Sequence, residues 1–353
     1  MSASRPSDET SPRPRTPHQQ MVEERRALLE AAHALQTLAP WSWMSEDLIV
    51  GLRTASVTEP DWMCVLGSSE SPSGFALHEG WGGFDLFEAS RTGEVDSDDV
   101  SAMQSSMLLT YLPKSSLRLA ERDELDASGL RFDAQVGFPV FERHLPGLVR
   151  SRLTIDEVRR LRVALEQIVD VSRRVRDEGL VIDPEDEPRL FVRTESVEGH
   201  DSSWSDRREE IPELVASVVP PMDEDVLAQL RTRPLNDGAC VQVDTFPLHS
   251  APDRDGVSVA SFTTLIVDLA SGQPLDVGLE AHASERYPRC RDVVALWMKR
   301  QPSLPRRVQV LRPDLADWLD TLCKPLGVEV ALVPEIPELE EARAALEDGL
   351  DEP

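Results

Sequence analysis

One acidic residue, Asp244, lies inside a segment that otherwise predicts a buried strand. Val241 and Val243 point to one face of this strand, so Asp244 points to the other. A carboxylate in that position can hold a divalent cation together with other acids. It can equally face water from an edge strand or pair with a nearby arginine. The residue pattern leaves these interpretations open.

A basic segment lies further along the chain. From Arg286 to Arg312 there are eight basic residues and one acid, Asp292, in a protein with a formal net charge of −27. Such a segment can form a phosphate-facing surface. The arginines that we assign to this surface are Arg289, Arg291, Arg306, Arg307 and Arg312. The alternative is a solvated helix face that balances the acidic parts of the chain.

Several common catalytic and metal-binding motifs are absent from the sequence. The four cysteines, at positions 64, 240, 290 and 323, lie too far apart for a C-x-x-C zinc or redox site. There is no P-loop and no G-x-S-x-G nucleophile elbow. The turn Trp81-Gly82-Gly83 lacks the G-x-G-x-x-G pattern, and we expect no helix to start there. The sequence therefore favours a protein that is not an enzyme, with no cofactor.

The charge and hydropathy of the chain restrict its partners. A net charge of −27 argues against general binding of DNA or RNA, although a local basic segment can still contact nucleic acid. The same acidity repels anionic membranes, and no apolar run is long enough to cross a bilayer. Residues 1–20 are polar and have no apolar centre, so we expect no secretory signal and a cytoplasmic location.

The composition along the chain predicts two domains. Its 353 residues exceed the usual size of one compact domain. A charged, proline-bounded stretch at 183–188 predicts a linker. The expected organisation is a disordered tail at 1–20, an α+β domain at 21–182, the linker, an α/β domain at 189–347 and an acidic tail at 348–353.

Periodic apolar residues predict the elements of these domains. In the first domain we expect a helix from Met21 to before Pro40, a hairpin at 62–67 and 75–80, and helices at 98–112 and 154–176. Thr154 and Glu157 form a capping box at the start of the last helix. In the second domain we expect strands at 189–194, 239–246, 257–269, 275–281, 307–311 and 328–333. Its expected helices are 223–231, 284–300, 313–324 and 338–347. The fold class is therefore α+β, with a mixed sheet and flanking helices in the second domain.

Several stretches of the chain resemble an uncharacterised bacterial two-domain family. In the first half these are the hairpin from Val65 to Gly80, the segment Phe138–Gly147 and the capped helix that follows. In the second half they are 243–247, 267–272, 310–314 and 326–330, followed by Ile336-Pro337. The resemblance spans roughly residues 25–347. It implies a bacterial, cytosolic origin and a two-domain architecture, and it implies no enzymatic activity.

The second half also resembles a ribonuclease-H-like or integrase-like fold. In that fold a first strand carries an Asp, two more strands form a meander, and a fourth strand ends near a second Asp. The resemblance implies that Asp244 is the first acid, Asp314 the second, and Glu340 or Glu341 the third. Such carboxylates would hold Mg²⁺ or Mn²⁺. Asp314 and the two glutamates also lie at predicted helix starts, where acids are favourable without any metal.

Two functions follow as expectations. The first is a non-catalytic binding or regulatory protein with an unknown protein partner, because no catalytic motif is complete. The alternative is a metal-dependent nuclease, or a degenerate ribonuclease-H-like protein, that acts on nucleic acid through Asp244 and Asp314.

Overall fold

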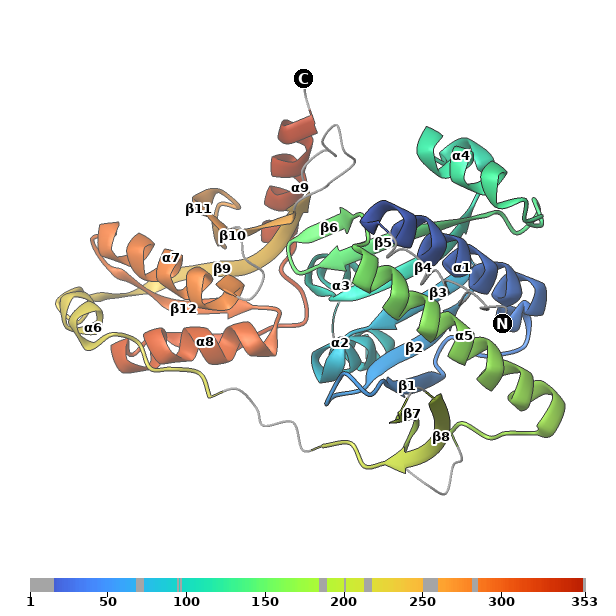
Figure 1. Ribbon diagram of the computed structural model, residues 1–353. Helices are drawn as coiled ribbons and strands as arrows, with labels where there is room; N and C mark the ends of the chain where they lie inside the picture. The colour runs from blue at the N-terminus through green and yellow to red at the C-terminus, as the bar shows by residue number, and fades with distance from the viewer. Residues whose placement is uncertain are drawn as a thin grey trace, which may run out of the picture. The chain divides into compact units, whose positions relative to one another are not determined.

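The computed structural model describes residues 16–67, 73–93, 95, 97–183, 189–199, 201–212, 218–249, 260–280 and 285–351 (Figure 1). The chain divides into two compact units whose segments alternate along the sequence. The first unit comprises Met1–Leu77, Met107–Glu142 and Arg152–Glu209; the second comprises His78–Ser106, Arg143–Ser151 and Glu210–Pro353. Helices and two mixed sheets build these units, which confirms the predicted α+β class.

The first sheet has the strand order β6-β5-β4-β3-β2-β1-β7-β8. Its strands are β1 (Ile49–Arg53), β2 (Asp61–Leu66), β3 (Gly74–His78), β4 (Ser106–Leu112), β5 (Phe138–Leu145), β6 (Leu148–Ser151), β7 (Leu190–Glu198) and β8 (Asp201–Glu209). The predicted hairpin is present as β2 and β3. Strand β1 pairs antiparallel with β2 and parallel with β7.

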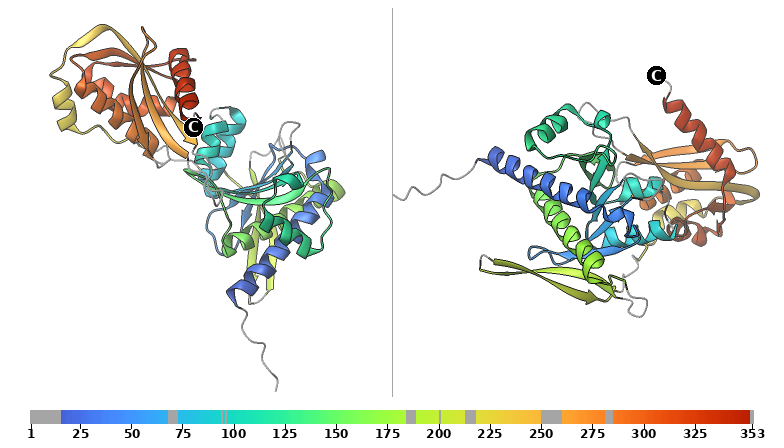
Figure 2. Two further views of the ribbon diagram at one scale, coloured as in Figure 1. Left: turned by 90° about the horizontal axis from the view of Figure 1, so that it is seen from above. Right: turned by 90° about the vertical axis from the view of Figure 1, so that its right-hand side faces the viewer.

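Helices α1 (Pro17–Leu38) and α5 (Ile155–Glu178) lie side by side against one face of this sheet (Figures 1 and 2). Their apolar residues and those of the strands form one buried core. The predicted capping box starts α5: the backbone N–H of Thr154 donates to Glu157 Oε2 at 2.7 Å, and the backbone N–H of Glu157 donates to Thr154 Oγ1 at 3.4 Å. A third helix, α4, spans Leu119–Ser128.

Two predictions in the first half are wrong. The expected helix at 98–112 is a short helix, α3 (Ser97–Met103), followed by strand β4. The residues of β4 alternate between buried and partly exposed positions, so the strand period prevails over the helical spacing of Met103, Met107 and Tyr111. A helix, α2 (Gly80–Thr92), does start at the Trp81-Gly82-Gly83 segment.

The second sheet has the order β11-β10-β9-β12-β13. Its strands are β9 (Leu235–His249), β10 (Ala260–Asp268), β11 (Pro274–Glu280), β12 (Leu304–Val310) and β13 (Glu329–Leu332). The first three form the predicted antiparallel meander, and β12 runs parallel to both β9 and β13. The helices are α6 (Glu224–Leu230), α7 (Arg286–Arg300), α8 (Pro313–Cys323) and α9 (Pro337–Asp351). Short 3₁₀ helices in the chain span Pro40–Ser42, Lys114–Ser116 and Lys324–Leu326.

Both faces of the second sheet are covered (Figure 2). Helices α6, α7 and α8 pack on one face, where Val241 and Val243 of β9 are buried. Helix α9 packs on the other face, where Phe246 is buried beneath Leu339. Asp244 therefore belongs to the α9 face, because even-numbered residues of this part of β9 point there.

Three predicted boundaries differ from the observed elements. The strand predicted at 189–194 is β7 and belongs to the first sheet, because it pairs with β1. The capping box of Thr16 and Gln19 extends α1 back to Pro17, and α9 continues to Asp351. The linker residues 184–188 lie outside the described residues, so the linker stays a prediction. No helix in the described ranges is both long and apolar enough to span a bilayer.

Candidate functional site

Asp244 is buried in the centre of strand β9 and is paired with an arginine. The residue is 4% exposed, and Arg312 Nε donates to Asp244 Oδ1 at 3.0 Å. This is the arginine pairing that the sequence left open. Burial raises the pKa of Asp244, while the neighbouring guanidinium acts in the opposite direction.

Arg312 reaches Asp244 because of its place in the sheet. It follows strand β12, which runs parallel to β9 with Val308 beside Val241, and it precedes α8. The same guanidinium also forms an ion pair with Asp99 on helix α3, whose side chain is fully buried. One arginine therefore joins two buried carboxylates.

A second arginine completes this arrangement. Arg286, in the first turn of α7, is 3% exposed and donates from Nη1 to Asp99 Oδ1 at 2.9 Å. Its guanidinium lies 4.3 Å from the ring centroid of Tyr287 and 5.3 Å from that of Phe262. Aromatic faces stabilise a cation that has lost its water.

We call Asp99, Asp244, Arg286 and Arg312 the Asp99 network. It holds two carboxylates and two guanidinium groups, so its formal charge is zero. A buried ion pair is costly to desolvate, and removing one member leaves an uncompensated charge. The network therefore favours a structural role, in which its ion pairs hold α3, α7 and β9 together, over the binding of a ligand from solvent.

The second predicted acid, Asp314, lies on the surface of this unit. It is exposed in the first turn of α8, as its helix-start position explains. It lines a cavity of about 480 Å³ together with Asp85, Glu88 and Met103. Desolvation raises the pKa of Asp85 in this cavity. Among the described residues no three His, Cys, Asp or Glu side chains gather as a metal would require.

The two candidates for the third acid, Glu340 and Glu341, are both exposed on α9. The acid of α9 that reaches the sheet is Glu338, whose Oε2 accepts from Gln242 Nε2 at 2.7 Å. Gln242 lies on the same face of β9 as Asp244, so Glu338 would have been the better candidate from the helix position.

The five arginines predicted to face phosphate do not share one environment. Arg289, Arg306 and Arg307 are exposed, and they lie within salt-bridge range of Glu285, Asp237 and Glu329 respectively. Arg291 is buried, stacks 4.8 Å from the ring centroid of Trp318 and donates to the Pro220 carbonyl. Arg312 belongs to the Asp99 network. Arg291 and Arg312 therefore face the interior, and a phosphate surface formed by the other three stays a prediction.

The sequence missed two members of the Asp99 network. Arg286 lies in the basic segment, and the sequence pattern gives it no separate role. Its position at a helix start, where a cation is unfavourable, is the signal that could have identified it as a buried partner. Asp99 had no such signal, because it lies in a seven-residue helix that the sequence pattern did not resolve.

Two family models match the chain. The first, a domain of unknown function (DUF7309), matches residues 26–193, and the second, a domain of unknown function (DUF6930), matches residues 226–347. No curated protein matches the sequence significantly. The two matches support an uncharacterised two-domain family and assign this chain a DUF7309 domain followed by a DUF6930 domain.

Proposed function

We propose that this protein is a non-catalytic binding or regulatory protein of the bacterial cytoplasm. The observation that carries the proposal is the pairing of Asp244 with Arg312 inside the Asp99 network. Asp244 is the residue on which metal-dependent chemistry would depend. A guanidinium stays charged at every physiological pH, so it neutralises this carboxylate permanently.

A divalent cation at Asp244 would have to compete with that arginine. Mg²⁺ and Mn²⁺ sites use carboxylates that are free to coordinate the ion, and two-metal sites need several of them within a few ångströms. In the second unit, Arg312 occupies one Asp244 oxygen at 3.0 Å, and Asp314 is exposed on α8. These contacts favour a structural role for the acid over a catalytic one.

A degenerate ribonuclease-H-like protein is the second candidate. The strand order β11-β10-β9-β12-β13 supports it, because the first strand, β9, carries Asp244 and is followed by a meander. Strand β12 then ends shortly before Asp314. In this form of the proposal the guanidinium groups of Arg286 and Arg312 stand where metal ions would stand in an active enzyme, and the sheet serves for binding.

Nucleic-acid cleavage separates the two candidates. The full chain is incubated with single-stranded and double-stranded DNA and RNA in Mn²⁺, beside Asp244→Ala and the control Asp237→Ala, whose side chain is 91% exposed. We expect no cleavage by any of the three proteins. Mn²⁺-dependent cleavage that Asp244→Ala abolishes and Asp237→Ala retains would refute the non-catalytic proposal.

Binding is tested with the full chain as bait. Proteins captured from its host are identified, purified and titrated against the bait by calorimetry. A stoichiometric complex between the two purified proteins would support a binding function, and failure of every captured candidate to bind would count against it.

A further inference from the structure

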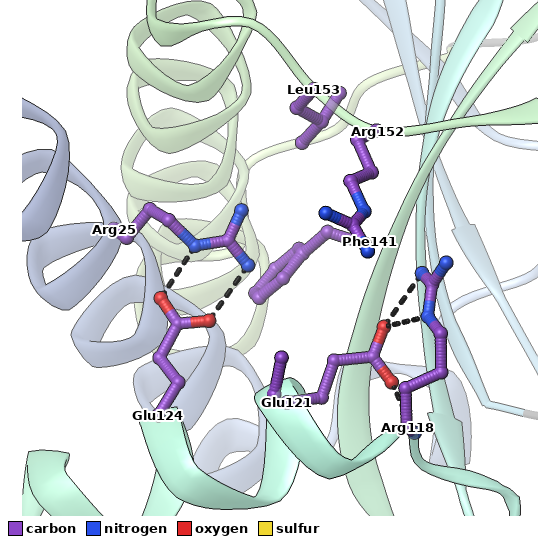
Figure 3. Close-up of a pocket in the computed structure, with 8 residues that line it drawn as sticks. Arg25, Arg118, Glu121, Glu124, Phe141, Arg152 and Leu153 are labelled. Atoms are coloured by element: carbon purple, nitrogen blue, oxygen red, sulfur yellow. Dashed lines mark hydrogen bonds and ion pairs between the residues drawn. The ribbon is translucent and has the colours of Figure 1, made fainter. Parts of the chain in front are cut away.

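The first unit holds a pocket in which one arginine has no partner among the described residues. The pocket encloses about 250 Å³ between α1, α4 and the start of α5. Its lining includes Arg25, Arg118, Glu121, Glu124, Phe141 and Arg152 (Figure 3). All of these residues belong to the first unit, so the pocket is separate from the Asp99 network.

Two ion pairs form opposite walls of this pocket. Arg25 of α1 holds Glu124 of α4 through both of its carboxylate oxygens, with Nη2 to Oε2 at 2.7 Å. Arg118 holds Glu121 at 2.7 Å, and its own backbone N–H donates to the other oxygen of that carboxylate at 2.8 Å. Bidentate contacts of this kind fix both side chains in the absence of a ligand.

Arg152 points into the space between these walls (Figure 3). It lies between strand β6 and the capping residue Thr154 of α5, and the next residue, Leu153, is buried. Its backbone is therefore anchored on both sides. Its exposed guanidinium forms no hydrogen bond or ion pair with any residue in the described part of the chain. It can therefore bind an external anion with its full set of donors.

The charge and shape of the pocket define the ligand class. Three arginines against two glutamates leave a net charge of +1, which a single carboxylate balances. A phosphate monoester carries more negative charge and would meet Glu121 and Glu124 as well. The volume lies below the range of about 300–1,000 Å³ that holds drug-sized ligands. The ring of Phe141 and the side chain of Leu153 supply an apolar surface beside Arg152.

From these contacts we infer that the pocket binds a small monocarboxylate with an apolar body, whose carboxylate pairs with Arg152. The inference goes beyond the proposed function, because it assigns a small-molecule site in the first unit. It holds whether or not the second unit cleaves nucleic acid.

Calorimetric titration of the full chain with sodium benzoate tests this inference. Benzoate carries one carboxylate and a ring that fits beside Phe141. We expect saturable binding with a Kd of about 1 mM or tighter, as the size of the ligand allows. Acetate and inorganic phosphate, titrated at matched ionic strength, are expected to bind several-fold more weakly.

Three variants localise the binding. Arg152→Gln is expected to raise the Kd for benzoate about ten- to a hundredfold, because a charge-assisted contact is lost. Arg152→Lys is expected to raise it less, since an ammonium keeps the charge and loses the fork. The control Arg131→Gln removes an exposed arginine outside the pocket and should leave the Kd unchanged.

Four results would overturn the inference. They are the absence of saturable benzoate binding, an unchanged Kd in Arg152→Gln, an equal loss in Arg131→Gln, and phosphate binding as tight as that of benzoate. None of these results bears on the proposed non-catalytic role of Asp244, because the nucleic-acid cleavage assay tests that role separately.

Discussion

Arg312 donates from Nε to Asp244 Oδ1 at 3.0 Å, and through this contact the C-terminal end of strand β12 is tied to the centre of strand β9. The same guanidinium pairs with Asp99 of helix α3. An acid that resembles a catalytic residue in the sequence is thus part of a buried, charge-balanced network. The burial of Asp244 and its pairing with Arg312 indicate its role better than its position in the strand does.

Removing Asp99 should destabilise the protein strongly. Asp99→Ala leaves Arg286 buried at 3% exposure without its carboxylate, and breaking a buried pair costs about 3–5 kcal/mol. The free energy of unfolding from urea titration at neutral pH measures the loss. The control Asp237→Ala removes a highly exposed acid and should change it by less than about 0.5 kcal/mol. Equal losses in the two variants would show that the Asp99 network contributes nothing to the free energy of unfolding.

The stability of the protein should depend on pH through His78. Burial lowers the pKa of His78 from 6.5 to about 4, and its ring lies against that of Phe87. Between pH 6.5 and about 4 the unfolded chain binds a proton at this residue that the folded chain does not bind. Stability is therefore lost as the pH falls through this window, by about 3 kcal/mol for such a shift.

His78→Gln should remove that part of the pH dependence. The test compares urea midpoints above pH 6.5 and near pH 4 for the wild type, His78→Gln and the control His18→Gln, an exposed histidine. We expect the wild type and His18→Gln to lose stability in parallel and His78→Gln to lose less. Three parallel profiles would contradict the assignment.

Three of the four cysteines should resist thiol reagents in the folded protein. Burial raises the pKa of Cys64 and Cys290 to about 12 and also raises the pKa of Cys323. Only the thiolate reacts, so these residues should be modified slowly near pH 8. Cys240 is only partly buried and should react first. Mass spectrometry after a short exposure to iodoacetamide identifies the modified residue, and all four should react in denaturant. Modification of the buried three at the rate of Cys240 would be the contrary result.

The capping box at the start of α5 should contribute measurable stability. Thr154→Ala removes the hydroxyl that accepts from the Glu157 amide and should cost about 1 kcal/mol. Thr37→Ala is the matched control, because its hydroxyl donates back to the His33 carbonyl within α1 and alanine is a better helix former there. A loss in Thr37→Ala as large as that in Thr154→Ala would rule out a specific effect of the cap.

Much of the fold could be predicted because single segments carry strong local signals. The capped helix α5, the β2–β3 hairpin and the meander before α7 each show the period of their own element. Strand β8 has no local signal, because its residues are mostly exposed and give no apolar alternation. The sequence predicts the wrong sheet for strand β7, because the pairing of β7 with β1 joins residues far apart in the chain. Such pairing leaves no trace in a local pattern.

The candidate site was predictable only in part, for a related reason. Asp244 stood out as an acid within an apolar strand, and its pairing with an arginine was one of the interpretations that the sequence allowed. Which arginine it meets depends on the register of β12 against β9. The contribution of Asp99 depends on the packing of a short helix whose sequence is polar. Neither relationship can be derived from the spacing of residues along the chain.

Calorimetric titration of the full chain with Mn²⁺ tests most directly whether Arg312, rather than a metal, neutralises Asp244. The wild type is compared with Asp244→Asn at neutral pH, with Asp237→Asn as the control for exposed acids. We predict that the three proteins give the same weak, non-saturating heats. Saturable Mn²⁺ binding in the wild type and Asp237→Asn that disappears in Asp244→Asn would contradict this account.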